Sequence, residues 1–156
     1  RRVLFRSGRT LDATFGDAGQ FMYVLTNLGQ SVLTSPSVFN FYSPLAPLPG
    51  TPGMFGPEFA IYSPGVAIQR ANFTYGLLTN QFASGVNFNL GAFVAAAGNA
   101  NTLVDLVNQK MFQGRMSNEL RGVLVATALA TSDPTNRAVG TVYLAAISSE
   151  FLVHAQ

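Results

Sequence analysis

Apolar residues recur at intervals of three and four along most of this chain, and one long proline-rich stretch interrupts them. Such intervals place apolar side chains on one face of an α-helix. The pattern therefore predicts an all-α fold: an irregular helical bundle with a long ordered loop rich in proline and aromatic residues, and a C-terminal antiparallel helical hairpin. The predicted helices cover residues 18–28, 64–82, 89–97, 102–112, 117–130 and 134–148, with a connector at 8–16 and a loop or short extended piece at 85–89.

Residues with known positional preferences mark the ends of these helices. Ser63-Pro64 and Asp133-Pro134 each place a capping side chain before a proline, whose missing N–H costs nothing in the first helical turn. Thr102 and Asp105 have the spacing of a capping box, in which the carboxylate reaches back to the cap amide. By the same preferences Asp17 and Ser117 cap helices, and Gly29 and Gly114 end them.

The proline-rich stretch runs from Leu28 to Arg70 and contains seven of the eight prolines. Prolines at this density exclude a long helix or a central strand. Aromatic residues alternate with the prolines, whereas a disordered segment is poor in them. We therefore expect an ordered, irregular wrap that buries most of its rings against the flanking helices. The alternative is that the rings form a contact surface for sugars or an apolar partner; this surface would consist of Phe39, Phe41, Tyr42, Phe55, Phe59 and Tyr62.

The chain carries few charges. Charged residues make up 10% of it and hydrophobic residues 48%, so uncharged polar side chains must cover much of the surface. This composition is more usual outside the cytoplasm. No apolar run approaches the roughly 20 residues that span a bilayer, so no transmembrane segment is expected. The absence of cysteine excludes disulfides and thiolate metal sites.

The first seven residues, RRVLFRS, resemble the translation of a sequencing adapter read in frame into an environmental gene fragment. The alternative is a native basic strand end. Without Arg1, Arg2 and Arg6, six basic residues face seven acidic ones, and the formal net charge changes from +2 to −1. No clustered basic surface then remains to bind nucleic acid or an anionic membrane. On this interpretation 1–7 is a non-native scar, and 8–156 is a single helical C-terminal subdomain of a larger protein.

Candidates for catalysis or cofactor binding are sparse. His154 is the only histidine, and a Ser-His-Asp triad would depend on it although it lies two residues from the end. Asp12, Asp17 and Asp105 could contribute oxygens to a cation site, but they lack EF-hand spacing, and capping explains the last two. No catalytic, cofactor or metal site is predicted.

Glu58 and Arg70 form the most informative charged pair. Both lie among apolar residues, where a charge is rarely buried without a partner. Eleven residues separate them along the chain, so a turn at Ser63-Pro64 could bring them together. We expect a structural ion pair that holds the wrap on the helix; the alternative is a ligand-binding pair.

Five segments of the chain carry a family resemblance: GQSVLTSPSVFNFYSP (29–44), GPEFAIYSP (56–64), AIQRANF (67–73), VDLVNQKMFQGRMS (104–117) and YLAAISSEFLVHAQ (143–156). Together they resemble the C-terminal part of the bacterial family catalogued as domain of unknown function 1800. The resemblance implies a longer, mainly helical protein that is commonly exported and often encoded beside exported proteins similar to sulfatases and phosphatases; it supplies no known reaction.

The chain departs from this family at two places. Ala60 stands where the family usually has glutamine, and Ser148-Ser149-Glu150-Phe151 stands where the family usually reads Ser-Pro-Glu followed by an aromatic residue. Both departures suggest a variation in packing more than a loss of chemistry.

These observations favour a structural or interaction module of the cell envelope or extracellular space. Its expected partners are the N-terminal part of the same protein and the exported sulfatase- or phosphatase-like protein encoded nearby. One alternative is part of an envelope hydrolase whose active site lies mainly in that N-terminal region. The other is a carbohydrate-binding surface on the aromatic wrap. Whether the protein is an enzyme is left open.

Overall fold

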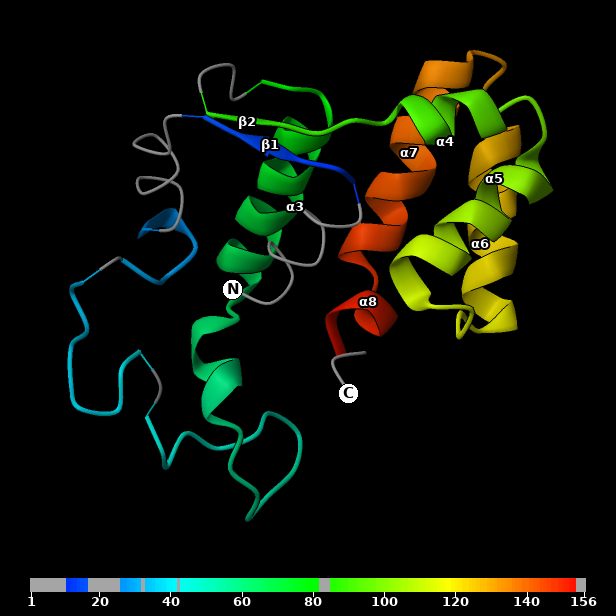
Figure 1. Cartoon of the computed structure of the whole chain (residues 1–156). Helices are drawn as coiled ribbons and strands as arrows, with labels where there is room; N and C mark the ends of the chain where they lie inside the picture. The colour runs from blue at the N-terminus through cyan, green and yellow to red at the C-terminus, as the bar shows by residue number, and fades with distance from the viewer. Residues whose placement is uncertain (1–10, 17–25, 32, 42, 82–84, 154–156) are drawn as a thin grey trace.

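The computed structural model describes residues 11–16, 26–31, 33–41, 43–81 and 85–153, with only the backbone of Phe15, Glu58, Ala60 and Val153. The described residues are mostly helical (Figure 1), so the predicted all-α class is confirmed. Residues 1–7, Asp17, Tyr42 and His154 lie outside them. The elements are β1 (Thr14–Phe15), the 3-10 helix η1 (Pro57–Ile61), α3 (Pro64–Leu78), β2 (Val86–Asn87), α4 (Gly91–Ala96), α5 (Ala100–Val107), the π-helix η2 (Asn108–Phe112), α6 (Asn118–Leu129), α7 (Pro134–Ile147) and α8 (Ser149–Val153).

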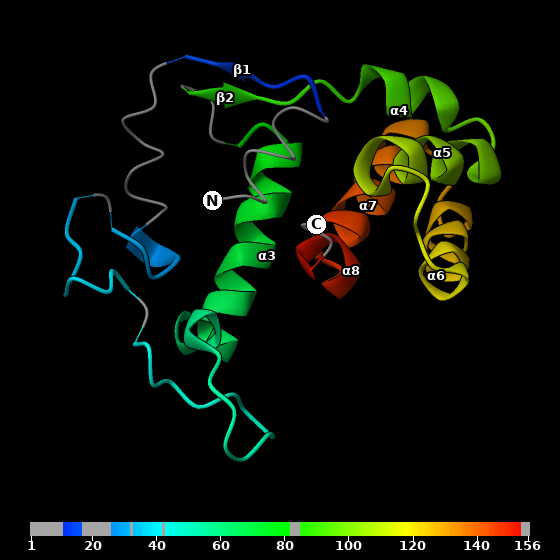
Figure 2. The same cartoon turned by 60° about the horizontal axis from the view of Figure 1, so that its bottom comes forward.

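Helix α7 is the centre of the helical body. It contacts α3, α4, α5, α6 and α8, and Figures 1 and 2 show it between α3 and the α5–α6 pair. Its most extensive partner is α6, so the predicted antiparallel hairpin of the last long helices is confirmed. The buried side chains of α7 are small, which lets neighbouring helices approach closely; they are Ala138, Thr141, Val142, Ala145 and Ala146.

Three of the predicted caps are present. The side-chain oxygens of Ser63, Ser117 and Asp133 each accept a hydrogen bond from the amide three residues later, over 3.3, 3.1 and 2.7 Å. Each bond satisfies one of the backbone donors that a helix N-terminus leaves unpaired. Gly29 adopts the left-handed conformation expected of a helix end, with φ of +78°, although most of the helix predicted before it lies outside the described residues.

The predicted capping box at Thr102 is wrong. Asn99 caps α5 instead, and its Oδ1 accepts hydrogen bonds from the amides of Asn101 and Thr102. The helix therefore begins before the expected box. Asp105 is free to form an ion pair with Arg121 of α6, with 2.6 Å between Oδ1 and Nη1.

The chain continues from α5 into η2, a π-helix, and ends close to the predicted stop. Gln113 and Gly114 both adopt left-handed backbone angles, with φ of +57° and +80°. A π-helix shifts the hydrogen-bond register by one residue. Met111 and Phe112 in this turn are buried.

Helix α3 differs from its prediction in length and orientation. It ends at Leu78, because Asn80 adopts a left-handed conformation with φ of +54°. The apolar spacing predicts a buried face that includes Ile68 and Tyr75, but these side chains are 63% and 46% exposed. Of the predicted face only Leu78 is fully buried; it packs into the body together with Phe73 and Leu77, which lie on the adjacent side of the helix.

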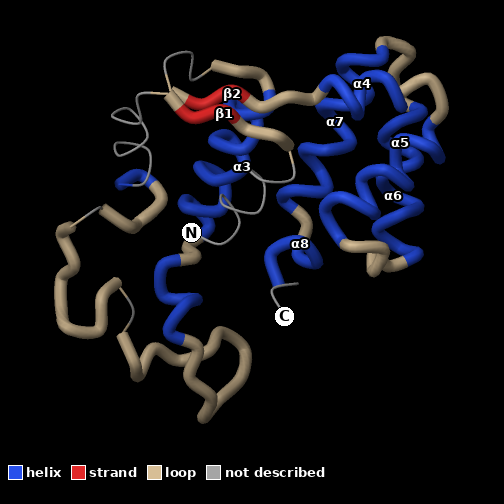
Figure 3. The backbone as a smooth tube through the Cα atoms, viewed as in Figure 1, coloured by secondary structure: helices blue, strands red, loops and turns tan. Residues whose placement is uncertain are grey.

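The connector predicted at 8–16 contains a strand. Thr14 pairs with Asn87, so β1 and β2 form an antiparallel ribbon (Figure 3). Leu11, just before the strand, is 1% exposed, and its carbonyl accepts a hydrogen bond from the Asn89 amide over 3.0 Å. Two-residue strands carry almost no periodicity, so the sequence pattern could not reveal this pairing.

Helix α8 was not predicted as a separate element. Phe151 is 2% exposed, and its ring packs edge-on against Phe112 with 5.9 Å between ring centroids. The Ser148 hydroxyl accepts a hydrogen bond from the Phe151 amide over 3.2 Å and so caps the helix. The Glu150 carboxylate accepts hydrogen bonds from both the amide and the hydroxyl of Ser117. Helix α8 therefore joins the π-helix to the start of α6.

Arg137 of α7 forms hydrogen bonds with two loop segments, one after α4 and one after α6. Its Nε and Nη2 donate hydrogen bonds to the Thr131 carbonyl over 3.0 and 2.8 Å, and its Nη1 donates to the Ala97 carbonyl over 2.7 Å. The planar guanidinium can reach both acceptors at once, which a lysine ammonium could not. These carbonyls follow α4 and α6, so one side chain fixes both helix ends against α7.

We expect Arg137→Met to cost about 3 kcal/mol, because it removes three hydrogen bonds from a charged donor and leaves carbonyls without a partner. Arg121→Met is the matched control; its ion pair with Asp105 is partly exposed and should be worth about 1 kcal/mol or less. Urea unfolding of both variants measures the difference. Equal losses of stability would contradict the structural role of Arg137.

We expect Ser149→Pro to stabilise the protein by about 0.4–1 kcal/mol, because proline restricts the unfolded chain. Ser149 holds the first position of α8, and Ser148 before it is extended (φ −63°, ψ 149°), as the residue before a proline prefers. Urea unfolding is the measurement, with Ser149→Ala as the control. A loss of stability specific to the proline variant would show that this helix start is not compatible with proline.

Candidate functional site

The proline-rich segment forms a loop that lies apart from the helical body. Figures 1 and 2 both show it projecting from the start of α3, on the side away from α4, α5 and α6. Part of it folds on itself: the Leu48 amide donates to the Met54 carbonyl over 2.8 Å, and the Gly56 amide donates to the Ala46 carbonyl over 2.9 Å. The loop thus has local order without cover from the helices.

Gly56 fixes the base of this loop. A Cβ atom at this position would lie 2.9 Å from side-chain carbons of both Leu48 and Phe59, closer than real Cβ contacts allow. The absence of a side chain lets these two residues pack over the backbone where η1 begins. Pro47 and Phe55 form an isolated antiparallel bridge, and this small hairpin (46–56) is therefore held in one position against the start of η1.

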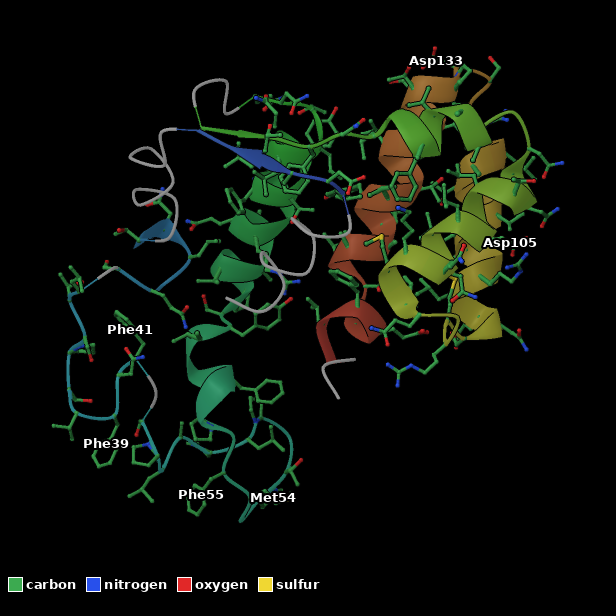
Figure 4. The ribbon with its side chains drawn as sticks, viewed as in Figure 1. Phe39, Phe41, Met54, Phe55, Asp105 and Asp133 are labelled. Atoms are coloured by element: carbon green, nitrogen blue, oxygen red, sulfur yellow. The ribbon has the colours of Figure 1, made fainter. Side chains whose placement is uncertain are left out.

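The rings of the loop are mostly exposed, so the expectation that most of them belong to the core is wrong. Phe39 is 58% exposed and Phe55 is 59% exposed. In Figure 4 both side chains point away from the helices. Phe59 and Tyr62 follow at 46% and 44%, and Phe41 is half-buried. Aromatic composition predicts order, but it does not tell whether the rings face a core or solvent.

Aliphatic side chains of the same loop are even more exposed. Leu33 is 98% exposed, Val38 95% and Leu45 70%. Met54, at 55%, lies beside Phe55 at the end of the molecule opposite to Asp133 (Figure 4). Leu33 was not among the residues predicted for the contact surface; the signal that could have identified these positions is the lack of any charged residue or histidine from Ala18 to Pro57.

Arg70 lies at the inner border of this surface. Its guanidinium carbon is 5.9 Å from the centroid of the Tyr62 ring, a distance at which the ring face attracts a cation. Burial lowers the pKa of Arg70, and the neighbouring Tyr62 opposes that shift. The Nη2 atom is buried, and none of the described residues accepts a hydrogen bond from it.

The structure brings only part of the predicted site together. Tyr62 and Arg70 are adjacent, while Phe39 and Phe55 lie farther out on the loop. The Glu58 side chain lies outside the described residues, so its pairing with Arg70 stays a prediction. Asp12 is exposed with a φ of +46°, just before β1.

The described part of the chain holds no group of three His, Cys, Asp or Glu residues that could bind a metal ion. None of the helices in it is long and apolar enough to cross a membrane.

Comparisons with protein-family models, curated protein sequences and solved structures found no match to this chain. The resemblance to domain of unknown function 1800 therefore stays a prediction from the residues quoted above.

We expect Glu58→Gln and Arg70→Met to be energetically coupled, because a carboxylate next to a half-buried guanidinium would satisfy its free donor. Breaking a buried pair costs about 3–5 kcal/mol and an exposed pair about 1 kcal/mol or less. At half burial we expect a coupling energy of about 1–3 kcal/mol in a double-mutant cycle read by urea unfolding. Additive effects of the two substitutions would contradict the pairing.

Proposed function

We propose that this protein is an interaction module of the cell envelope or extracellular space, and that its proline-rich loop is the contact surface. The observation that carries the proposal is the exposure of large apolar side chains on one loop, from Met54 at 55% to Leu33 at 98%. Proteins rarely keep such side chains together in water unless a partner covers them. Single exposed apolar residues would need no such explanation.

The rigid backbone of the loop supports a binding role. Pro44, Pro47, Pro49 and Pro52 fix backbone angles in and near the hairpin. Rigid segments lose less conformational freedom when they bind, so more of the contact energy appears as affinity. The loop is therefore suited to presenting its side chains to a partner, although it adds little to the core of the protein itself.

The family resemblance supports the location and gives two partners to test. It implies an exported protein, and the low charge of the chain agrees with that location. The candidate partners are the N-terminal part of the same protein and an exported sulfatase- or phosphatase-like protein encoded nearby. No observation on the described residues favours the alternative of an envelope hydrolase.

Carbohydrate binding is the second candidate function. Phe55, Phe59 and Tyr62 are between 44% and 59% exposed and close together in sequence, and sugar rings stack on such aromatic faces. Soluble oligosaccharides should then quench tyrosine fluorescence, which is readable because the chain has no tryptophan. Saturable quenching that Phe55→Ser and Phe59→Ser abolish would favour this function over an apolar contact.

We expect the folded protein to bind the hydrophobic dye anilinonaphthalene sulfonate through the loop. The triple variant Phe39→Ser, Leu45→Ser, Phe55→Ser should lose more than half of the dye fluorescence and keep a cooperative thermal transition. The matched control is Val123→Ser, Leu129→Ser, which replaces exposed apolar residues of α6 (50% and 67% exposed). A folded parent protein without dye binding, or an equal loss in the control, would contradict the proposal.

A further inference from the structure

We infer that this loop binds the surface of a lipid bilayer. Its exposed side chains insert into the bilayer to the depth of the headgroup boundary. The inference rests on the proposed function and names the chemistry of the partner: an apolar phase beneath a neutral interface. The side chains that would insert are Leu33, Val38, Phe39, Leu45, Met54 and Phe55.

The first argument is the absence of charge. From Ala18 to Pro57 the sequence contains no Asp, Glu, Lys, Arg or His. A charged side chain that enters the apolar region of a membrane carries a large free-energy cost. Protein interfaces are depleted of charge only at their cores, whereas their rims are polar and arginine is enriched in them. The described residues from Thr26 to Pro57 are mostly exposed and carry no charge, which fits hydrocarbon better than it fits another protein.

The second argument is the shape of the surface. Leu33 and Val38 are 98% and 95% exposed, so almost the whole surface of each side chain is available to a partner. A protein partner would need a separate pocket for each protruding side chain, whereas lipid chains rearrange around any of them. Phe39, Met54 and Phe55 all lie at the same end of the molecule in Figure 4. One flat interface could therefore receive them together.

The third argument concerns the backbone, which has to keep its polar groups satisfied near lipid. The prolines of the loop have no N–H to leave unpaired. The amides of Asn40 and Leu48 donate to the Ser37 and Met54 carbonyls within the loop, over 3.0 and 2.8 Å. The remaining serine, threonine and asparagine groups suit the headgroup region, so the loop would lie in the interface and not cross the bilayer.

The charge pattern also predicts which lipids suffice. Because no basic residue occurs from Ala18 to Pro57, the inserting part of the loop gains nothing from anionic headgroups. Neutral phosphatidylcholine vesicles should be enough, and salt should have little effect because screening acts on charges.

The test is co-sedimentation of the whole chain with phosphatidylcholine vesicles. We expect the parent protein to bind, the variant Phe39→Ser, Leu45→Ser, Phe55→Ser to bind at least tenfold more weakly, and the α6 control Val123→Ser, Leu129→Ser to bind like the parent. Raising the salt concentration should change binding less than twofold. Thermal melting of each variant shows that it is folded.

Three results would overturn the inference: no binding of the parent to vesicles, equal losses in loop variant and control, or binding that requires anionic lipid and low salt. If the dye binds the loop but vesicles do not, the proposed function stands and the lipid occupant is wrong. A concentration-dependent dimer that the loop substitutions dissociate would identify a second copy of the chain as the occupant instead.

Discussion

The structure depends on the close approach that the small side chains of α7 permit. Ala138, Val142 and Ala145 have no exposed surface, and the helices α3, α4, α5, α6 and α8 all contact α7. Arg137 fixes the geometry at one end of α7 by holding the Ala97 and Thr131 carbonyls. A larger side chain on this face would separate several helices at once, because interiors are packed to crystal density. The positions of the neighbouring helices therefore depend on small side chains on the buried face of α7.

The helices that pack around α7 do not cover the first half of α3 or the loop before it, so these segments lie outside the core. The body receives Phe73, Leu77 and Leu78 from the end of α3, and the ring of Tyr75 touches Tyr143 at 5.8 Å between centroids. Ile68, two turns earlier, already faces solvent. The protein thus consists of a packed helical body and the proline-rich loop, which the body does not cover. The apolar side chains of the loop therefore remain exposed and form the proposed contact surface.

The sequence was most informative where structure is set locally. Ser63-Pro64 and Asp133-Pro134 could be recognised as helix starts because a capping oxygen and a fixed φ act within one turn. Prediction failed where partners distant in the chain decide. Asn99 and Thr102 are both plausible caps from the sequence alone. Which side of α3 is buried depends on its contact with α7. Strand β1 exists only through its pairing with β2. For the candidate site, Arg70 and the rings were identified from sequence, but their exposure depends on what the body fails to cover.

The lack of basic residues in the loop also determines which proteases can cleave this protein. Between Arg9 and Arg70 the chain has no lysine or arginine, so an enzyme of trypsin-like specificity, whose pocket selects a basic side chain, finds no bond to cut in the most accessible segment of the protein. An enzyme with a hydrophobic slot finds Phe39 and Phe55 presented to it. In a compartment that contains both kinds of protease, the lifetime of the loop is therefore set by the second kind, and a partner that covers the rings would also protect the chain from cleavage.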